Sequence, residues 1–215
     1  LVKEHAVVDM ALWAGAIGPP LQSADDLTAM SDLGAAAFKS FMASSSPLFP
    51  AVDTAQMLWV MEQAAELGIP YGLHAEDQSL LQAGLARTEG MGRRDPLAHA
   101  ESRPPIVETV AVSTALLLAA ETGCRAHICH LASAGALELV RAAKARGLKV
   151  TAETCPQYLM LNTDDLERLA GFARCAPAIR VQAEVDQLWE GVLDGTIDLI
   201  CSDHCPYTTE SKEAG

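Results

Sequence analysis

Short apolar segments alternate with longer amphipathic segments along this chain, and that alternation constrains the fold more than any other feature. The short segments have the length of strands, and the longer ones have helical periodicity. This order predicts parallel βαβ units within one α/β domain that covers residues 1–215. The pattern alone fits either a doubly wound sheet or a (β/α)₈ barrel. The predicted strands are Ala6–Leu12, Ala36–Met42, Tyr71–His74, Ala126–Leu131, Lys149–Thr154 and Ile197–Ser202.

The predicted helices carry start and stop signals at their ends. Asp53 or Thr54 is positioned to cap one helix, which Gly68 and Pro70 then end. The segment Gln78–Arg103 is less regular, and we expect a helix followed by a surface loop there. The other predicted helices are Asp25–Leu33, Thr54–Leu67, Pro105–Thr122, Ser133–Arg146 and Val181–Leu193.

Charge and cysteine content exclude several classes of function. The chain has 15 Lys and Arg against 28 Asp and Glu, a net charge of −13, so we expect no nucleic-acid partner. The most apolar stretch, Val107–Ala120, is interrupted by polar residues, and we expect no membrane association. Six cysteines in 215 residues are too few for a disulfide scaffold. We expect them to be reduced and the protein to be cytoplasmic.

Four predicted strands end on, or contain, a residue that can bind a metal ion or transfer a proton. These residues are Lys39, His74, His130 and Asp203. Each one alone also fits a structural role, such as a paired lysine, a hydrogen-bonded histidine or a turn-capping aspartate. Because parallel strands end at one edge of the sheet, their recurrence there favours a site for Zn²⁺ or a similar ion. A lysine fits such a site only if modification, for instance carbamylation, makes its tip an anion.

Seven ordered motifs spanning nearly the whole chain resemble those of the cyclic amidohydrolases, the family of allantoinase, hydantoinase (dihydropyrimidinase) and dihydroorotase. The motifs are Phe38-Lys39-Ser40-Phe41-Met42, Leu73-His74-Ala75-Glu76, Ser102-Arg103-Pro104-Pro105, Cys129-His130-Leu131-Ala132-Ser133, Glu153-Thr154-Cys155-Pro156-Gln157-Tyr158, Cys175-Ala176-Pro177-Ala178-Ile179-Arg180 and Ser202-Asp203-His204-Cys205-Pro206-Tyr207.

This resemblance implies a (β/α)₈ TIM barrel, of which the chain would hold strands three to eight, and a centre with two divalent metal ions. Lys39 would be the carboxylated lysine that bridges them, with His74 and His130 as ligands of one ion. Asp203 would be a ligand of the other ion and the general base. A hydroxide bridging the ions would open the ring of a small cyclic amide. Zn²⁺ is favoured, and Mn²⁺, Co²⁺, Ni²⁺ or Fe²⁺ suit the same ligands.

One departure from the family pattern concerns the metal ligands. The His-x-His pair of the family's first strand has no counterpart here, because His5 stands alone. The chain therefore resembles an internal fragment that also lacks part of the C-terminal β-sandwich. With four of the six protein ligands, we expect it to be inactive by itself.

Within the family, the residues favour ring-opening of allantoin to allantoate, a step of purine catabolism. Val8–Gly15 and Ser44–Pro50 resemble allantoinase segments, and Ser44 stands where hydantoinases have a catalytic tyrosine. Gln157 and Cys205 read more like hydantoinases, so hydantoinase (dihydropyrimidinase) and dihydroorotase stay open. Ala176 holds the place that lies against the substrate ring in related hydantoinases, and it could offer only backbone groups.

A function of a different class also stays open. Some relatives have lost their metal ligands and act as non-catalytic scaffolds, whereas this chain keeps Lys39, His74, His130 and Asp203. That ligand set favours the enzyme. The family also implies a homo-oligomer, expected to be a tetramer.

Overall fold

The described part of the chain contains one six-stranded parallel sheet. The computed structural model describes residues 2–44 and 49–213, so residues 45–48 of the allantoinase-like segment lie outside it. The strands pair in chain order, each parallel to the next. They are β1 (Trp13–Gly15), β2 (Ala37–Phe41), β3 (Tyr71–His74), β4 (Ala126–Ile128), β5 (Val150–Thr154) and β6 (Leu199–Ile200).

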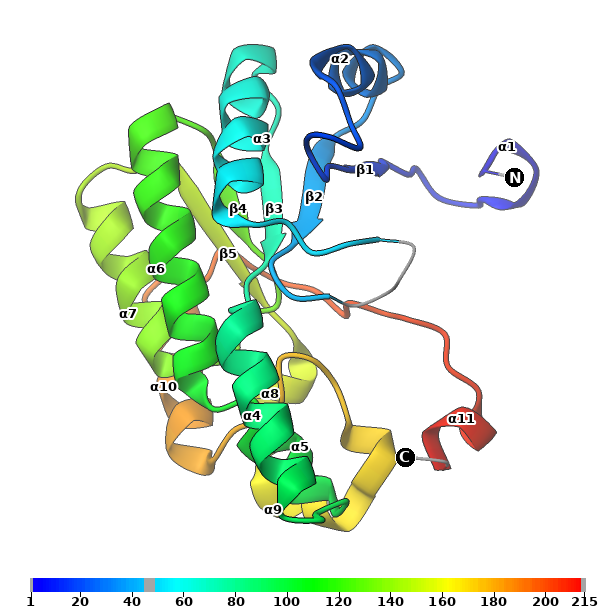
Figure 1. Cartoon of the computed structure of the whole chain (residues 1–215), viewed down its shortest axis with the longest axis vertical. Coiled ribbons are helices and arrows are strands. Elements are labelled where there is room, and N and C mark those ends of the chain that lie inside the picture. The colour runs from blue at the N-terminus through cyan, green and yellow to red at the C-terminus, as the bar shows by residue number, and fades with distance from the viewer. Residues whose placement is uncertain (1, 45–48, 214–215) are drawn as a thin grey trace.

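Pairing in chain order identifies the sheet as part of a (β/α)₈ barrel. A doubly wound sheet reverses its strand order at a switch point, and this sheet has no reversal. The connecting helices α3, α6 and α7 lie side by side along one face of the sheet (Figure 1). The helices are α1 (Val2–His5), α2 (Ala24–Asp32), α3 (Thr54–Leu67), α4 (Gln78–Gly90), α5 (Pro96–Ser102), α6 (Pro105–Thr122), α7 (Ala134–Ala145), α8 (Pro156–Met160), α9 (Thr163–Leu169), the 3₁₀ helix η1 (Ala170–Ala173), α10 (Gln182–Leu193) and α11 (Thr209–Glu213).

The two faces of the sheet differ in chemistry. Phe38, Leu73 and Ile128 point toward the helices and are fully buried in the main core. Residues of the opposite parity, such as Lys39 and His127, face the interior that a barrel encloses. Strand pairing aligns Lys39 with Gly72, Gly72 with His127, and His127 with Thr151. The interior face is therefore markedly more polar than the helix-covered face.

The predicted first strand is wrong in its position. Residues 6–12 form no strand, and β1 is Trp13–Gly15, after a short α1. Val7 and Val8 are 97% and 71% exposed, so no strand among residues 2–44 and 49–213 covers their apolar side chains. The ladder to β2 begins only where Trp13 pairs with Ala37.

The five predicted helices are confirmed to within one residue at both ends, and α3 uses the expected caps. The Asp53 side chain accepts a hydrogen bond from the Gln56 amide at the start of α3, and Gly68 ends that helix with φ 68°. The surface loop expected before Arg103 is wrong in part, because α5 lies within it. Asp95 caps α5 and Pro96 occupies its first turn.

The helical stretch Pro96–Thr122 is long and apolar enough by composition to cross a membrane, with a mean hydropathy of 1.3. It comprises α5 and α6, and α6 packs between α3 and α7. One face of α6, including Val107, Ala111 and Ala115, is fully buried in the fold. Packing against the sheet and neighbouring helices thus accounts for the apolar residues on that face of α6.

Leu137 provides a test of this packing. It lies on α7, is 1% exposed, and fills the space that a side chain on Gly191 of α10 would need. We expect Leu137→Ala to lower the free energy of unfolding by about 2–5 kcal/mol, because it removes buried contacts and leaves a cavity. Leu117→Ala, at a site 65% exposed on α6, is the matched control and should cost less than about 1 kcal/mol. Equal losses of unfolding free energy in the two variants, measured by urea unfolding, would contradict the packing described.

Candidate metal centre

Two histidines predicted as metal ligands meet at the carboxyl ends of the strands. His74 is the last residue of β3, and His130 follows β4 by two residues. Both are buried, and Nδ1 of His74 lies 3.1 Å from Nε2 of His130. Two nitrogens bound to one tetrahedral Zn²⁺ at about 2.0–2.1 Å would be about 3.3 Å apart. The spacing of this pair therefore fits a shared metal ion.

A buried carboxylate fixes the orientation of His74. Glu76 Oε2 lies 3.0 Å from Nε2 of His74 and accepts a hydrogen bond of 2.9 Å from Nη1 of Arg103. Burial raises the pKa of Glu76, but the His74 hydrogen bond and the charge of Arg103 outweigh it and hold the pKa below its usual value. An ionised Glu76 accepts the Nε2 proton of His74 and leaves Nδ1 with a lone pair directed at His130.

His130 is kept in the neutral form that binds metals. Burial is the main cause that holds the pKa of His130 well below its usual value, and the electrostatic influence of the neighbouring His74 and Lys39 acts in the same direction. Its Nδ1 atom is buried and has no hydrogen-bond partner among residues 2–44 and 49–213. A neutral imidazole that carries its proton on Nδ1 leaves a lone pair on Nε2, the nitrogen that faces His74, for a cation.

His130 and Asp203 share an uncommon backbone conformation. Their φ angles are 40° and 44°, in the left-handed region that non-glycine residues seldom occupy. Both residues come just after a strand, where the backbone turns away from the sheet. Strained backbone of this kind concentrates at functional sites, which supports a functional role for both side chains.

Lys39 lies near the histidine pair, whereas Asp203 lies in different surroundings. The Lys39 side chain, on β2, contacts the thiol of Cys129, and its Nζ atom is 5.2 Å from the centre of the Phe41 ring. Its charge also acts on His130. Asp203 is exposed, and its charge acts on the thiols of Cys129 and Cys155. The structure thus brings Lys39, His74 and His130 together. Asp203 lies on the exposed segment that follows β6.

A second buried ion pair holds the loop after His130. The amide of Ala132 donates a 2.8 Å hydrogen bond to Oε1 of Glu108 on α6. Arg180 approaches the other oxygen of Glu108 at 3.6 Å and also donates to the backbone carbonyl of Arg103. The sequence motifs did not reveal the roles of Glu76 and Glu108. A carboxylate two residues after His74 was the available signal for Glu76.

Ala176 lies half-buried in the loop between η1 and α10. The carbonyl of Cys175 before it is 2.7 Å from Nε2 of His99, and the carbonyl of Pro177 after it accepts a 2.7 Å hydrogen bond from Tyr158. Both neighbours of Ala176 are thus anchored to the fold. The proposed contact of Ala176 with a substrate stays a prediction.

Comparison with known proteins finds relatives along almost the whole chain. It is 38% identical over 211 residues to an allantoinase of Rubrobacter xylanophilus, covering 98% of this chain and 46% of the relative. It is 35% identical over 209 residues to an L-hydantoinase of Paenarthrobacter aurescens, covering 97% and 45%. The solved L-hydantoinase (dihydropyrimidinase) of Arthrobacter aurescens superposes with a TM-score of 0.92 at 35% identity, covering 96% and 46%.

The matches cover almost all of this chain but less than half of each relative. The chain spans about half the length of the curated relatives it matches. No protein-family model matches the sequence. The superposition with part of a longer hydantoinase chain agrees with the interpretation of the sheet as part of a barrel.

The contact between Glu76 and His74 leads to a test in metal binding. We expect Glu76→Gln to weaken binding of Zn²⁺ about 10–100-fold, because the neutral amide no longer fixes the orientation and basicity of His74. Glu89→Gln, on the exposed surface of α4, is the control. Calorimetric titration of each variant with Zn²⁺, starting from metal-free protein, would measure the two affinities. Equal affinities in the two variants would refute the role of Glu76.

His99, which anchors the Cys175 carbonyl, makes stability depend on pH. Burial lowers its pKa to about 4, so between about pH 6.5 and 4 the unfolded chain takes up a proton that the folded chain excludes. Stability contributed by neutral His99 is therefore lost as the pH falls, by on the order of 3 kcal/mol. We expect His99→Gln to reduce this dependence of the unfolding free energy on pH, measured by urea unfolding at several pH values. His5→Gln, at an exposed site, should leave the dependence unchanged.

Proposed function

We propose that this chain, which belongs to the family of the allantoinases and hydantoinases, forms part of an active site that hydrolyses the ring amide of a small cyclic substrate. The observation that carries the proposal is the pair of buried histidine nitrogens 3.1 Å apart at the carboxyl ends of β3 and β4. Active sites of (β/α)₈ barrels lie at this end of the strands. The reaction class follows from the relatives, which are hydrolases of cyclic amides.

The side chains at this edge suit divalent metal ions. His74 and His130 would hold one ion, Asp203 would bind a second, and Lys39 would bridge the two after carbamylation of its amine. Supporting this modification, an unmodified ammonium at Lys39 would repel cations beside His130. The metals would polarise the amide carbonyl and lower the pKa of bound water. Zn²⁺ suits the nitrogen ligands best, and Mn²⁺, Co²⁺, Ni²⁺ or Fe²⁺ fit the same set.

The protein's own residues would transfer the proton, orient His74 and contact the substrate ring. The Asp203 carboxylate would take a proton from the attacking water and pass it to the ring nitrogen that leaves. Glu76 and Arg103 would keep His74 oriented during turnover, and the anchored loop around Ala176 would lie against the substrate ring.

Allantoin is the substrate that the residues favour. Hydantoinases carry a catalytic tyrosine where this chain has Ser44, whose backbone amide donates to the side chain of Gln78. Without that tyrosine, stabilisation of the developing oxyanion needs another donor. Hydantoins or dihydropyrimidines are the alternative, followed by dihydroorotate, and a scaffold without activity is the alternative of another class. A cytoplasmic homotetramer without nucleic-acid or membrane partners stays our prediction.

Ring-opening assays on the natural protein test the substrate and the base together. We expect faster hydrolysis of allantoin than of hydantoin or dihydroorotate, and loss of activity after metal removal by a chelator. Asp203→Asn should lower kcat about 10²–10⁴-fold, the usual contribution of general acid–base catalysis. Asp186→Asn, on the exposed face of α10, serves as the control. A metal-loaded protein that opens none of these rings would support the scaffold alternative.

A further inference from the structure

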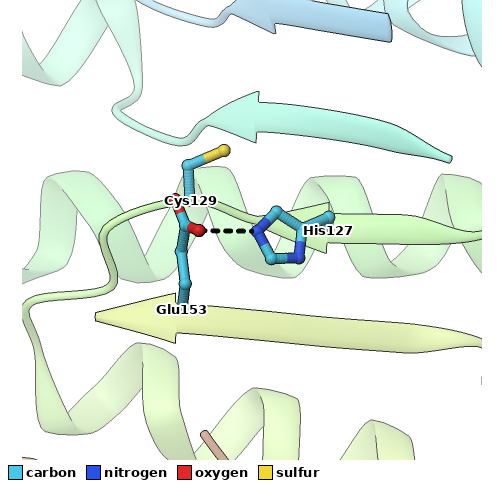
Figure 2. A group of neighbouring side chains, drawn as sticks. All are labelled: His127, Cys129 and Glu153. Carbon is cyan, nitrogen blue, oxygen red and sulfur yellow. Dashed lines mark ion pairs between the residues drawn. The ribbon is translucent and has the colours of Figure 1, made fainter. Parts of the chain in front are cut away.

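Three side chains that the proposed reaction does not use form a second cluster on the interior face of the barrel. His127 lies on β4, Cys129 directly follows it, and Glu153 lies on the neighbouring β5. Figure 2 shows the side chains of His127 and Glu153 facing each other, with the Cys129 side chain next to them. One imidazole nitrogen, the thiol sulfur and one carboxylate oxygen all lie within 4.8 Å of one another.

The polar atoms of this cluster are buried and incompletely paired. The side chains of His127 and Glu153 are 9% and 13% exposed, and Cys129 is 3% exposed. Nδ1 of His127 lies 2.7 Å from the hydroxyl of Thr151. Nε2 lies 3.3 Å from Oε2 of Glu153, and no partner meets it in good hydrogen-bond geometry within the described ranges. A cation bound by both atoms would satisfy each of them.

The surrounding charges set what the cluster can bind. The Cys201 thiol is hydrogen-bonded to the Glu153 carboxylate and helps to hold it in place. The ammonium of Lys39 contacts Cys129 and is the positive charge that opposes a cation here. Burial raises the pKa of the Glu153 carboxyl, but the interaction with His127 and also the charge of Lys39 hold that pKa below its usual value, so the Glu153 carboxylate offsets the positive charge. Carbamylation of Lys39 would remove the opposition altogether.

We infer that His127, Cys129 and Glu153 form a separate site for one thiophilic divalent cation of the Zn²⁺ class, apart from the centre built on His74 and His130. Nitrogen, sulfur and oxygen are the ligands that Zn²⁺ takes, and three protein ligands leave one coordination position open. Sulfur favours Zn²⁺ and Cd²⁺ over Mg²⁺ or Mn²⁺.

Titration with Cd²⁺ tests this site in the natural protein, because a thiolate bound to Cd²⁺ absorbs ultraviolet light through charge transfer. His74→Ala combined with His130→Ala removes the first centre, and in that background we expect a one-equivalent absorption band. Cys129→Ser should abolish the band, whereas Cys124→Ser, another buried cysteine in the core, should retain it. His127→Gln should weaken Cd²⁺ binding by more than the about 10–100-fold that loss of an outer-shell partner costs.

Each outcome decides between this site and the proposed active centre. A band that survives in Cys129→Ser would place the ion on another thiol and overturn the inference. Loss of the band in the double histidine variant would assign the ion to the first centre and overturn it as well. Circular dichroism verifies that each variant is folded, and His127→Gln provides a second variant with little change in volume. Loss of hydrolysis alone would bear on the proposed function and leave this site unaffected.

Discussion

The parallel pairing of the strands in chain order is the constraint on which the rest of the structure depends. Each strand returns to the sheet beside its predecessor, so the crossover helices collect on one face. The other face becomes an interior, and all strands end at one edge. Residues as far apart in sequence as Lys39 and His130 can therefore act on one another. The helix-covered face supplies the apolar core, which leaves the interior free to carry polar groups.

Burial of charge at that edge is offset by pairing. Glu76 is fully buried, and it is matched by His74 on one side and Arg103 on the other. Arg180 and Glu108 repeat this arrangement behind the His130 loop. A buried charge without such partners would cost several kcal/mol. The pairs link the strand ends to α6 and to the segments before and after it, so the geometry of the histidines depends on contacts from several elements.

The sequence predicted those parts of the fold that local chemistry determines. Helix α3 could be located from Asp53 and Gly68, because caps act within a few residues. The first strand was placed too early, since apolar alternation in residues 6–12 cannot reveal whether a partner strand lies beside it. The candidate metal ligands could be found because residues of metal-binding types occur at or near the ends of the predicted strands in the sequence. The pairing of Glu76 with Arg103 depends on side-chain packing across 27 positions, which a one-dimensional pattern does not contain.

The left-handed backbone at His130 and Asp203 limits which residues can replace them. Apart from glycine, the residues that most readily adopt this conformation are asparagine, aspartate and histidine. Of these, only aspartate and histidine are common metal ligands. The backbone conformation and the need for a metal-binding side chain are separate requirements. Together they restrict both positions to aspartate or histidine. A substitution that preserves the chemistry, such as glutamate for Asp203, would meet the second requirement and fail the first.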